Sequence, residues 1–276
     1  MANLDKDTVA GFGDEWQRFD QSVVEAQEME ATFREYFSVF PWDTLPVGAV
    51  GADFGCGSGR WAALVAPRVG HLHVVDASHE ALDVARRNLA DRSNVTFHDA
   101  PLDAVELENG SLDFGYSLGV LHHIPDTLAA MRACVQKLKP GAPLLVYLYY
   151  RFDNRPAWYA HLWQLSELAR RRISRLPHGA RYAVSQLFAA GVYWPLARSA
   201  KLVETLGGSA DNLPLSYYRD RSFYTMRTDA LDRLGTRLEQ RFTRVEIEAM
   251  MRDAGLEDVE FSDGTPYWCA VGRRRR

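Results

Sequence analysis

The sequence predicts an α/β fold built on a largely parallel β-sheet, and three observations support this. From residue 49 to 150, short β-rich runs alternate with helical stretches, which is typical of βαβ units. A glycine-rich turn directly follows the first of these runs. The run at residues 144–148 is apolar throughout, as expected for a strand buried on both faces of a parallel sheet. The expected strands are residues 49–54, 71–76, 95–98, 112–117 and 144–149.

The composition is that of a globular protein. Of 276 residues, 47% are hydrophobic and 25% are charged, and the formal net charge is −4. Because this balance is acidic, no general attraction to nucleic acid or to anionic lipid is expected. Three scattered cysteines and the lack of a zinc-like Cys/His spacing argue against a disulfide framework and a metal site. An acidic start without an apolar core, and no apolar window of about 18 residues, predict neither a signal peptide nor a membrane span, hence a cytoplasmic protein.

The texture of the sequence changes along the chain and predicts four segments. These are a helical, acidic leader (1–45), the alternating region (46–150), a helical insertion (151–242), and a last helix with a closing β-hairpin (243–276). The insertion contains two long helical patterns, at 157–176 and 181–206, and Pro195 interrupts the second. Thr243 and Glu246 have the spacing of a capping box, which predicts the start of the last helix.

The clearest motif is the turn Asp53-Phe54-Gly55-Cys56-Gly57-Ser58-Gly59 after the first strand. Glycines at a strand-to-helix turn allow positive φ and let a ligand approach the backbone closely. Arg60 stands where a dinucleotide fingerprint has its third glycine. Asp53 would repel a pyrophosphate but suits a ligand that carries an ammonium and a sulfonium group, as S-adenosylmethionine does. The loop therefore fits this cofactor better than NAD, and an NAD-dependent oxidoreductase is the weaker alternative.

Two further acids follow the next expected strands. Asp76, before Ala77, ends the second strand about 20 residues beyond the loop, where a carboxylate can accept both ribose hydroxyls. Asp99, before Ala100, ends the third strand and is placed to accept an adenine amino group. The alternative is that both acids cap the following helices. Together with Asp53, however, they lie at the carboxyl ends of three successive strands, where open α/β sheets bind ligands.

Residues 48–150 resemble a class I S-adenosylmethionine-dependent methyltransferase of the group that acts on small molecules. Residues 53–59 match the first motif of this family and Asp76 matches its ribose-binding acid. Residues 112–126 are similar to its fourth motif, and 138–142 resemble the turn before its fifth strand. The resemblance implies a Rossmann-like seven-stranded sheet of order 3-2-1-4-5-7-6 with an antiparallel last strand. It also implies that the helical insertion lies between strands 5 and 6.

The cofactor contacts expected from the motifs and the resemblance come from the strand ends. They are Asp53, Phe54, Gly55, Cys56, Gly57, Asp76, Ala77, Asp99, Ala100 and Leu118. Residues 12–19 resemble a segment that folds over the cofactor in some relatives. This predicts that the leader closes the cofactor cleft, with Trp16 covering the site and Arg18 meeting the cofactor carboxylate. The alternative is a helix that packs Trp16 and Phe19 on the sheet.

His122 and His123 follow the fourth strand and are the candidate catalytic residues. Methyl transfer is an in-line displacement that mainly requires alignment, but a hydroxyl acceptor also needs a base, and histidine titrates near neutrality. The alternative is that packing or backbone hydrogen bonds account for both rings. The preceding residues, 118–121, lack the Asn/Asp-Pro-Pro-aromatic pattern of enzymes that methylate base amino groups. Methylation of adenine or cytosine is therefore not expected.

Aromatic and arginine side chains are the candidate acceptor contacts, because they bind carboxylates, phosphates and sugar rings. The candidates are Tyr149, Arg151, Tyr218, Arg219, Arg221 and Tyr224. All but Tyr149 belong to the insertion, which is predicted to form a lid over the cleft. The alternative is that the aromatics form the core of the insertion and the arginines its solvated face. The run Arg170-Arg171-Arg172 is interpreted as such a solvated face.

The sequence thus predicts a methyltransferase that moves the methyl group of S-adenosylmethionine, leaving S-adenosylhomocysteine, to a small molecule. The expected acceptor atom is a hydroxyl oxygen on a sugar-like or anionic metabolite. The alternatives are a methyltransferase acting on tRNA or protein, and a non-catalytic S-adenosylmethionine-binding module. No metal, nucleic acid or membrane partner is expected, and the apolar insertion leaves a homodimer open.

Overall fold

The computed structural model describes residues 3–210 and 212–276. The chain forms two compact units. The core unit contains Met1–Ser22, Glu30–Tyr150 and Leu238–Arg276, and the insertion unit contains Val23–Met29 and Arg151–Arg237. In the described residues, no helix combines the length and the apolar character that crossing a bilayer requires.

The core unit is built on a seven-stranded sheet of order β3-β2-β1-β4-β5-β7-β6. The strands are β1 (Val50–Phe54), β2 (His71–Asp76), β3 (Val95–Asp99), β4 (Phe114–Leu118), β5 (Pro143–Tyr147), β6 (Leu256–Phe261) and β7 (Cys269–Arg274). The first five pair in parallel, and β7 runs antiparallel between β5 and β6. The predicted fold class, strand order and antiparallel last strand are confirmed. The fourth strand starts two residues later than predicted.

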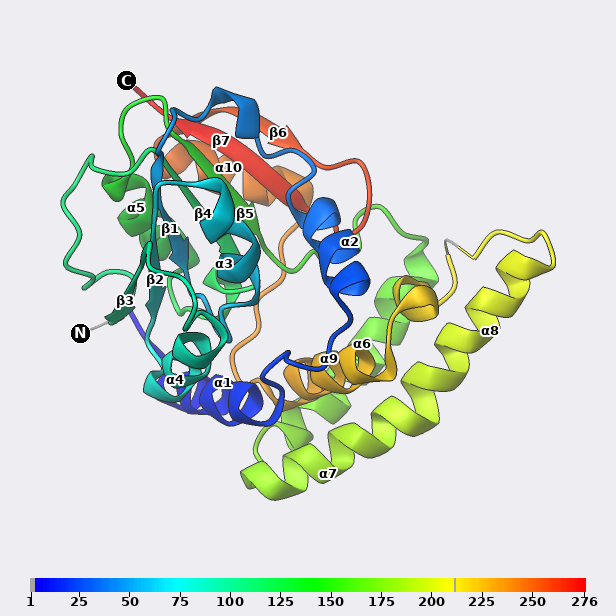
Figure 1. The fold of residues 1–276 in the computed structure, drawn as a ribbon. Coiled ribbons are helices and arrows are strands. Elements are labelled where there is room, and N and C mark those ends of the chain that lie inside the picture. The colour runs from blue at the N-terminus through cyan, green and yellow to red at the C-terminus, as the bar shows by residue number, and fades with distance from the viewer. Residues whose placement is uncertain (1–2, 211) are drawn as a thin grey trace. The chain divides into compact units, whose positions relative to one another are not determined.

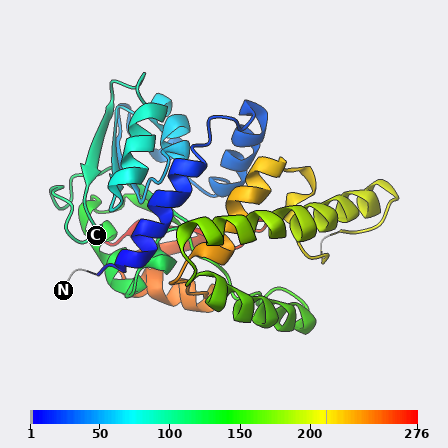
Figure 2. The same cartoon turned by 90° about the horizontal axis from the view of Figure 1, so that it is seen from below.

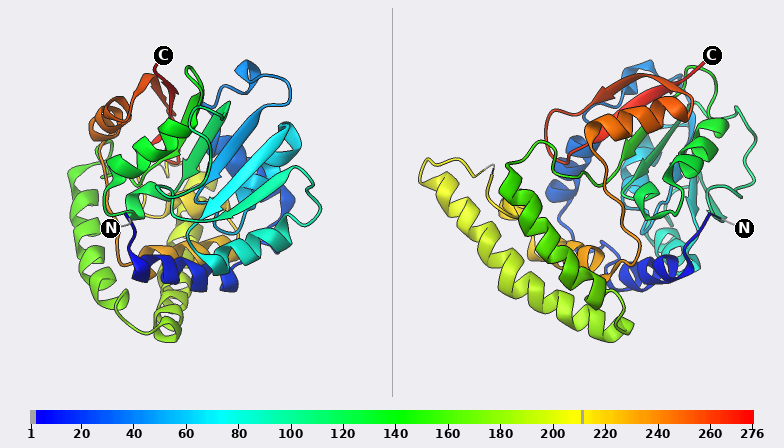
Figure 3. Two further views of the ribbon diagram at one scale, coloured as in Figure 1. Left: turned by 90° about the vertical axis from the view of Figure 1, so that its left-hand side faces the viewer. Right: turned by 180° about the vertical axis from the view of Figure 1, so that it is seen from behind.

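Helices cover both faces of this sheet. One face carries α3 (Arg60–Val65) and α4 (His79–Asn88), in front in Figure 1. The other carries α5 (Thr127–Lys137) and α10 (Arg244–Asp253), which are in front when the molecule is seen from behind in Figure 3. This arrangement places the loops that follow β1, β2, β3 and β4 along one edge of the sheet.

The leader forms two helices, α1 (Lys6–Arg18) and α2 (Ala26–Tyr36). Helix α1 packs along α4, as Figure 2 shows from below. Helix α2 ends before Pro41, as predicted, and carries Phe33 toward the Phe37 and Trp61 rings. The aromatic residues of the leader therefore pack on the core unit.

Two glycines allow aromatic rings to fill the centre of the sheet. A β-carbon on Gly51 would lie 2.2 Å from the Phe114 ring, and one on Gly115 would lie 2.8 Å from the Phe54 ring. Both phenylalanines are fully buried. Strands β1 and β4 thus depend on glycine at these positions for close packing.

Replacing Gly51 with alanine should lower the free energy of unfolding by about 1–3 kcal/mol, because the new methyl group must displace the Phe114 ring. Chemical denaturation followed by circular dichroism measures this change. Gly264→Ala is the control, since a β-carbon at Gly264 meets open space and should leave stability unchanged. Equal stability of the Gly51 variant and the wild type would contradict the described packing.

The insertion unit is helical. Its helices are α6 (Ala157–Ile173), α7 (His178–Phe188), α8 (Trp194–Thr205) and α9 (Phe223–Gly235). Helix α7 continues through a π-helical turn, Ala189–Tyr193, into α8, so Pro195 lies in the first turn of α8, where it is tolerated. Helix α9 is capped by Ser222, and the Glu28 carboxylate accepts hydrogen bonds from the Ser222 amide and the Thr225 hydroxyl. These bonds explain why residues 23–29 belong to this unit.

Arg170 is not part of a solvated face, and the sequence interpretation of it is wrong. Its side chain is buried and forms an ion pair with Glu167, one helical turn earlier, at 2.6 Å, and it also donates to the Thr236 carbonyl. Arg233 of α9 reaches the same carboxylate at 3.4 Å. Glu167 therefore joins α6 to α9, whereas Arg171 and Arg172 are exposed, as predicted.

Glu167→Gln should lower the free energy of unfolding at pH 7 by about 1–3 kcal/mol, because it leaves buried guanidinium groups without a charged partner. Burial opposes ionisation of Glu167, but the arginines outweigh it and lower its pKa from 4.5 to about 2. The stabilisation is therefore complete above about pH 4.5 and is lost as the pH falls toward 2.

Denaturant unfolding at pH 7 and in acid checks this expectation. The wild type and the variant should converge in stability at low pH. Glu248→Gln removes an exposed pair with Arg252 and should change stability little at either pH. A difference between the wild type and Glu167→Gln that persists in acid would contradict the role of this carboxylate.

Candidate active site

The glycine loop turns sharply at the carboxyl end of β1. Gly55, Gly57 and Gly59 have φ angles of +86°, +53° and +77°, in the left-handed region that favours glycine. The Gly55 and Cys56 amides both donate to the Val75 carbonyl, at 2.8 and 3.0 Å. The loop is thereby fixed against β2 with its backbone turned toward the edge of the sheet.

Asp76 lies next to this loop. One carboxylate oxygen accepts from the Gly57 amide at 2.8 Å and the other accepts from the Ser78 amide at 2.9 Å, on the far side of Ala77. Burial raises the pKa of Asp76. The N-cap of α4 is Ser78, so Asp76 does not cap this helix itself. A carboxylate offers about four acceptor positions, so Asp76 retains capacity for the hydroxyl groups of a ligand.

Asp99 stands beside Asp76, because the two residues are in register in the β2–β3 pair. Its partly exposed carboxylate is 2.7 Å from Nδ1 of His79, and this hydrogen bond raises the pKa of His79. The amide of Ala100 donates to the Asp76 carbonyl at 3.0 Å. The ends of the second and third strands thus bring both predicted acids to one place.

Asp53 is 1% exposed and faces Tyr116 in the neighbouring strand. In the described part of the chain, one of its carboxylate oxygens has no hydrogen-bond partner. Burial raises the pKa of Asp53 to about 8, and the negative charge of Asp76 acts in the same direction. A buried acid of this kind is suited to a cationic group, whose charge would favour the ionised carboxylate.

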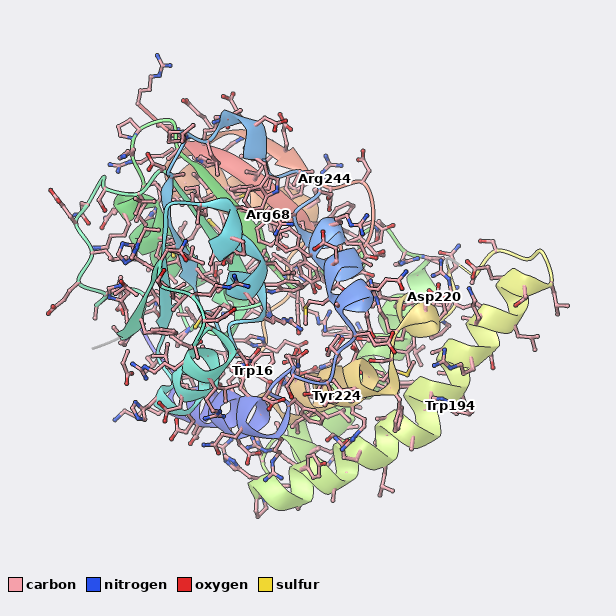
Figure 4. All side chains as sticks on the ribbon, viewed as in Figure 1. Trp16, Arg68, Trp194, Asp220, Tyr224 and Arg244 are labelled. Carbon is pink, nitrogen blue, oxygen red and sulfur yellow. The ribbon has the colours of Figure 1, made fainter. Side chains whose placement is uncertain are left out.

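Trp16, labelled in Figure 4, belongs to α1 and contacts the glycine loop. A β-carbon on Gly57 would lie 2.8 Å from the Trp16 indole, and the Arg60 guanidinium stands 5.6 Å from the centre of the same ring. The Asn88 amide donates to the carbonyls of Asp20 and Ser58, which ties the leader to the loop. Arg18, predicted to meet a cofactor carboxylate, pairs with Asp14 at 2.9 Å.

His122 and His123 lie in a short 3-10 turn, Leu121–His123, after β4, and both are buried. Their ring centres are 4.0 Å apart, and the Tyr149 ring lies 3.9 Å from that of His122. Burial lowers the pKa of His122 well below 6.5, and neither of its ring nitrogens has a hydrogen-bond partner among the described residues. His122 is therefore a neutral, packed ring.

His123 has a defined orientation. Its Nδ1 is 2.7 Å from the Leu238 carbonyl oxygen, which can only accept a hydrogen bond. The proton of the neutral ring is therefore on Nδ1, and the basic lone pair is on Nε2. A histidine that acts as a general base through Nε2 requires this tautomer, in which Nδ1 carries the proton and is held by a hydrogen bond.

The histidine turn and the glycine loop are adjacent. A β-carbon on Gly55 would lie 2.4 Å from the Val120 side chain. In the sequence, Val120 follows Leu118, at the end of β4, and precedes the two histidines. Since β1 and β4 are paired neighbours, the predicted cofactor residues and the predicted catalytic residues share one edge of the sheet.

A segment that the sequence analysis missed lies against these histidines. We call residues 238–242 the strap. The Gln240 amide donates to the His122 carbonyl at 3.0 Å, and the Gln240 side chain donates to the Ile124 carbonyl at 2.8 Å. Arg241 stacks 5.1 Å from the Tyr149 ring centre. No motif marks this stretch in the sequence, because its role depends on backbone groups.

The predicted acceptor residues divide between the two units. Tyr149 belongs to the core unit and lies in the histidine cluster. The other five belong to the insertion unit: Arg151, Tyr218, Arg219, Arg221 and Tyr224. Arg219 pairs with Glu204 at 3.0 Å, and Arg221 is buried with its guanidinium 4.9 Å from the Tyr217 ring centre. Burial raises the pKa of Tyr218 well above 10.0.

Comparison with known proteins gives the same family as the motifs. A model described as a methyltransferase domain matches residues 52–141. A ubiquinone biosynthesis O-methyltransferase from Aromatoleum aromaticum is 27% identical over 46% of this chain and 58% of its own length. Phosphoethanolamine N-methyltransferase 2 from Caenorhabditis elegans is 32% identical over 35% of this chain and 23% of its own length. The chain therefore spans less than two thirds of either relative.

Solved structures show the same fold. An O-methyltransferase family protein from Burkholderia thailandensis aligns with a TM-score of 0.56 at 16% identity, over 94% of this chain and 59% of that protein. The family match, the relatives and the strand order agree. Residues 52–141 thus match a methyltransferase domain, and the strand order of the sheet is the one expected for a class I S-adenosylmethionine-dependent methyltransferase.

Proposed function

We propose that the protein transfers the methyl group of S-adenosylmethionine to a hydroxyl oxygen of a small molecule. The observation that carries this proposal is the oriented His123, whose Nδ1 is held by the Leu238 carbonyl at the same sheet edge as the glycine loop. The names of the relatives support a small acceptor but include both an O- and an N-methyltransferase.

The residues of the loop region fit this cofactor. Asp53 is a buried acid with an oxygen that lacks a hydrogen-bond partner, which suits the ammonium group. Asp76 retains acceptor positions for ribose hydroxyls, and Asp99 is proposed to accept the adenine amino group. The positive-φ backbone at Gly55 and Gly57 permits close approach. When bound, the cofactor supplies an electrophilic methyl group on a sulfonium.

His123 is proposed to act as the base. Its Nε2 accepts the hydroxyl proton as the acceptor oxygen gains the methyl group, and the Leu238 carbonyl stabilises the imidazolium through Nδ1. His122 is neutral and packs between His123 and Tyr149, so we assign it a supporting role. This ring stack limits the rotation of His123.

The acceptor is proposed to contact Tyr149 in the core unit. Within the insertion unit taken by itself, the candidate acceptor contacts proposed from the sequence are Arg151, Tyr218, Arg219, Arg221 and Tyr224. Arg219 and Arg221 are held by Glu204 and by the Tyr217 ring, and their planar groups are therefore ordered before an acceptor binds. Ordered guanidinium and phenol groups favour a sugar-like or anionic acceptor.

Binding of S-adenosylhomocysteine should release a proton from Asp53 at pH 7. The free carboxyl is mainly protonated because its pKa is raised to about 8, and the ligand ammonium favours the ionised form. Calorimetric titration in buffers of different ionisation enthalpy measures this release, and Asp53→Asn should abolish it. Asp76→Ala should weaken binding at least about tenfold, or about 1.4 kcal/mol.

NADH is the control ligand and should not bind. A wild-type binding enthalpy that is the same in every buffer would exclude Asp53 as the ammonium partner. Failure of S-adenosylhomocysteine to bind would remove the cofactor assignment.

His123→Gln should lower kcat by about 10²- to 10⁴-fold and leave S-adenosylhomocysteine affinity within about twofold, since only the base is removed. The assay requires an acceptor found by screening sugar-like and anionic hydroxyl compounds for methylation. His71→Gln is the control, because His71 begins β2 at the opposite edge of the sheet. Full kcat in the His123 variant would eliminate it as the base.

A further inference from the structure

One face of α1 touches both halves of the site. Thr8, Phe12 and Trp16 are spaced four residues apart, so their side chains lie on the same face of the helix. Trp16 covers Gly57 of the glycine loop. Phe12 meets the His123 ring edge-on, with the ring centres 4.9 Å apart. The same helix therefore contacts the proposed cofactor loop and the proposed base.

Thr8 is linked to His123 through one residue of the strap, Leu238. The Leu238 amide donates to the Thr8 hydroxyl oxygen at 3.3 Å, and the Leu238 carbonyl accepts from His123 Nδ1 at 2.7 Å. Thr8 is 4% exposed, so water cannot readily replace its hydroxyl. Both polar groups that flank Leu238 are thus fixed, one by α1 and the other by the histidine.

Helix α1 is itself firmly docked on the core unit. Its N-cap is Asp5, whose side chain accepts from the Thr8 amide at 2.8 Å. A β-carbon on Gly13 would lie 2.8 Å from the Ser78 hydroxyl at the start of α4, so the two helices approach closely there. The position of Thr8 is therefore set by the same packing that places Trp16 on the loop.

We propose that Thr8 is a positioning residue for His123, and that α1 makes the orientation of the base depend on its docking over the cofactor loop. The inference rests on the proposed role of His123. Without the Thr8 hydroxyl, the part-buried Leu238 N–H loses its acceptor, which is unfavourable. Leu238 is then expected to change its backbone torsion angles so that its N–H finds another acceptor, and this change moves the Leu238 carbonyl, which belongs to the next peptide group, away from Nδ1.

The strap residue Gln240 has a separate task. Its amide and side chain hold the carbonyls of His122 and Ile124, which fixes the main chain of the turn. These bonds end on main-chain carbonyls, so they fix the backbone of the turn, whereas the Leu238 carbonyl is the group bonded to the His123 ring itself. The selection of the tautomer is therefore assigned to the Thr8–Leu238 link.

The test compares Thr8→Val, which keeps the shape but removes the hydroxyl, with Thr8→Ser, which keeps the hydroxyl. Thr8→Val should lower kcat at least about tenfold while KM for the acceptor stays within about twofold, because alignment and not binding is lost. Thr8→Ser should restore the wild-type kcat. Thr44→Val is the matched control, since exposed Thr44 bonds the Pro41 carbonyl at the amino edge of the sheet.

A spectroscopic readout accompanies the kinetics. Nitrogen-15 NMR of the histidine rings in the full-length wild type should show the His123 proton on Nδ1 at neutral pH. Thr8→Val should populate the other tautomer, and Thr8→Ser should not. The wild-type measurement needs no variant, so it can overturn the inference even if Thr8→Val fails to fold. A wild-type ring with its proton on Nε2 would overturn the inference.

Two kinetic outcomes separate this inference from the proposed function. Wild-type kcat in Thr8→Val, together with loss of activity in His123→Gln, would overturn the inference and leave the base in place. Wild-type kcat in His123→Gln would overturn the base and, with it, the positioning role of Thr8.

Discussion

The hydrogen bond from the Gly57 amide to the Asp76 carboxylate holds the functional edge of the core unit together. It fixes the glycine loop against β2, and it fixes the acid that is proposed to bind ribose. Because the loop is held there, Gly57 presents a flat backbone surface on which Trp16 can lie. Helix α1 docks through Trp16, and the leader in turn brings Thr8 and Phe12 to the histidine turn. The Gly57 amide thus adds to the Gly55 and Cys56 amides in holding the loop, and it is the one that also positions a carboxylate.

Some buried polar groups of the site do not contribute to the stability of the fold. Asp53 is buried, and burial together with the neighbouring Asp76 disfavours its ionisation more than Tyr116 and Arg60 favour it. Burying such a group does not by itself stabilise the folded protein. Acids of this kind are typical of functional sites, because a cationic ligand favours the ionised carboxylate and thereby gains binding free energy. His122 follows the same principle, as a fully buried ring whose nitrogens have no partner in the described chain.

The sequence predicts the sheet well because the alternation of strands and helices and the glycine loop are local signals. The second strand is predicted to the residue, at His71–Asp76. The strap could not be predicted, because its peptide groups act on His122 and His123 from far along the chain. Helix α9 is not predicted from the sequence, because aromatic and arginine residues dominate its start. Its N-cap, Ser222, is nevertheless a common one. Arg170 was misinterpreted because its burial depends on Glu167 and on the distant Thr236 carbonyl.

The insertion leaves and re-enters the core unit at neighbouring points, since Tyr150 and Phe242 form a β-bridge and the Phe242 amide bonds the Tyr149 carbonyl. A segment whose two ends are already joined by the core can change in length or sequence at little cost in chain entropy. Residues 151–237 can therefore vary while the loops at the carboxyl ends of β1 to β4 stay intact. In such an architecture, relatives that share the same methyl donor can diverge in the compounds they modify.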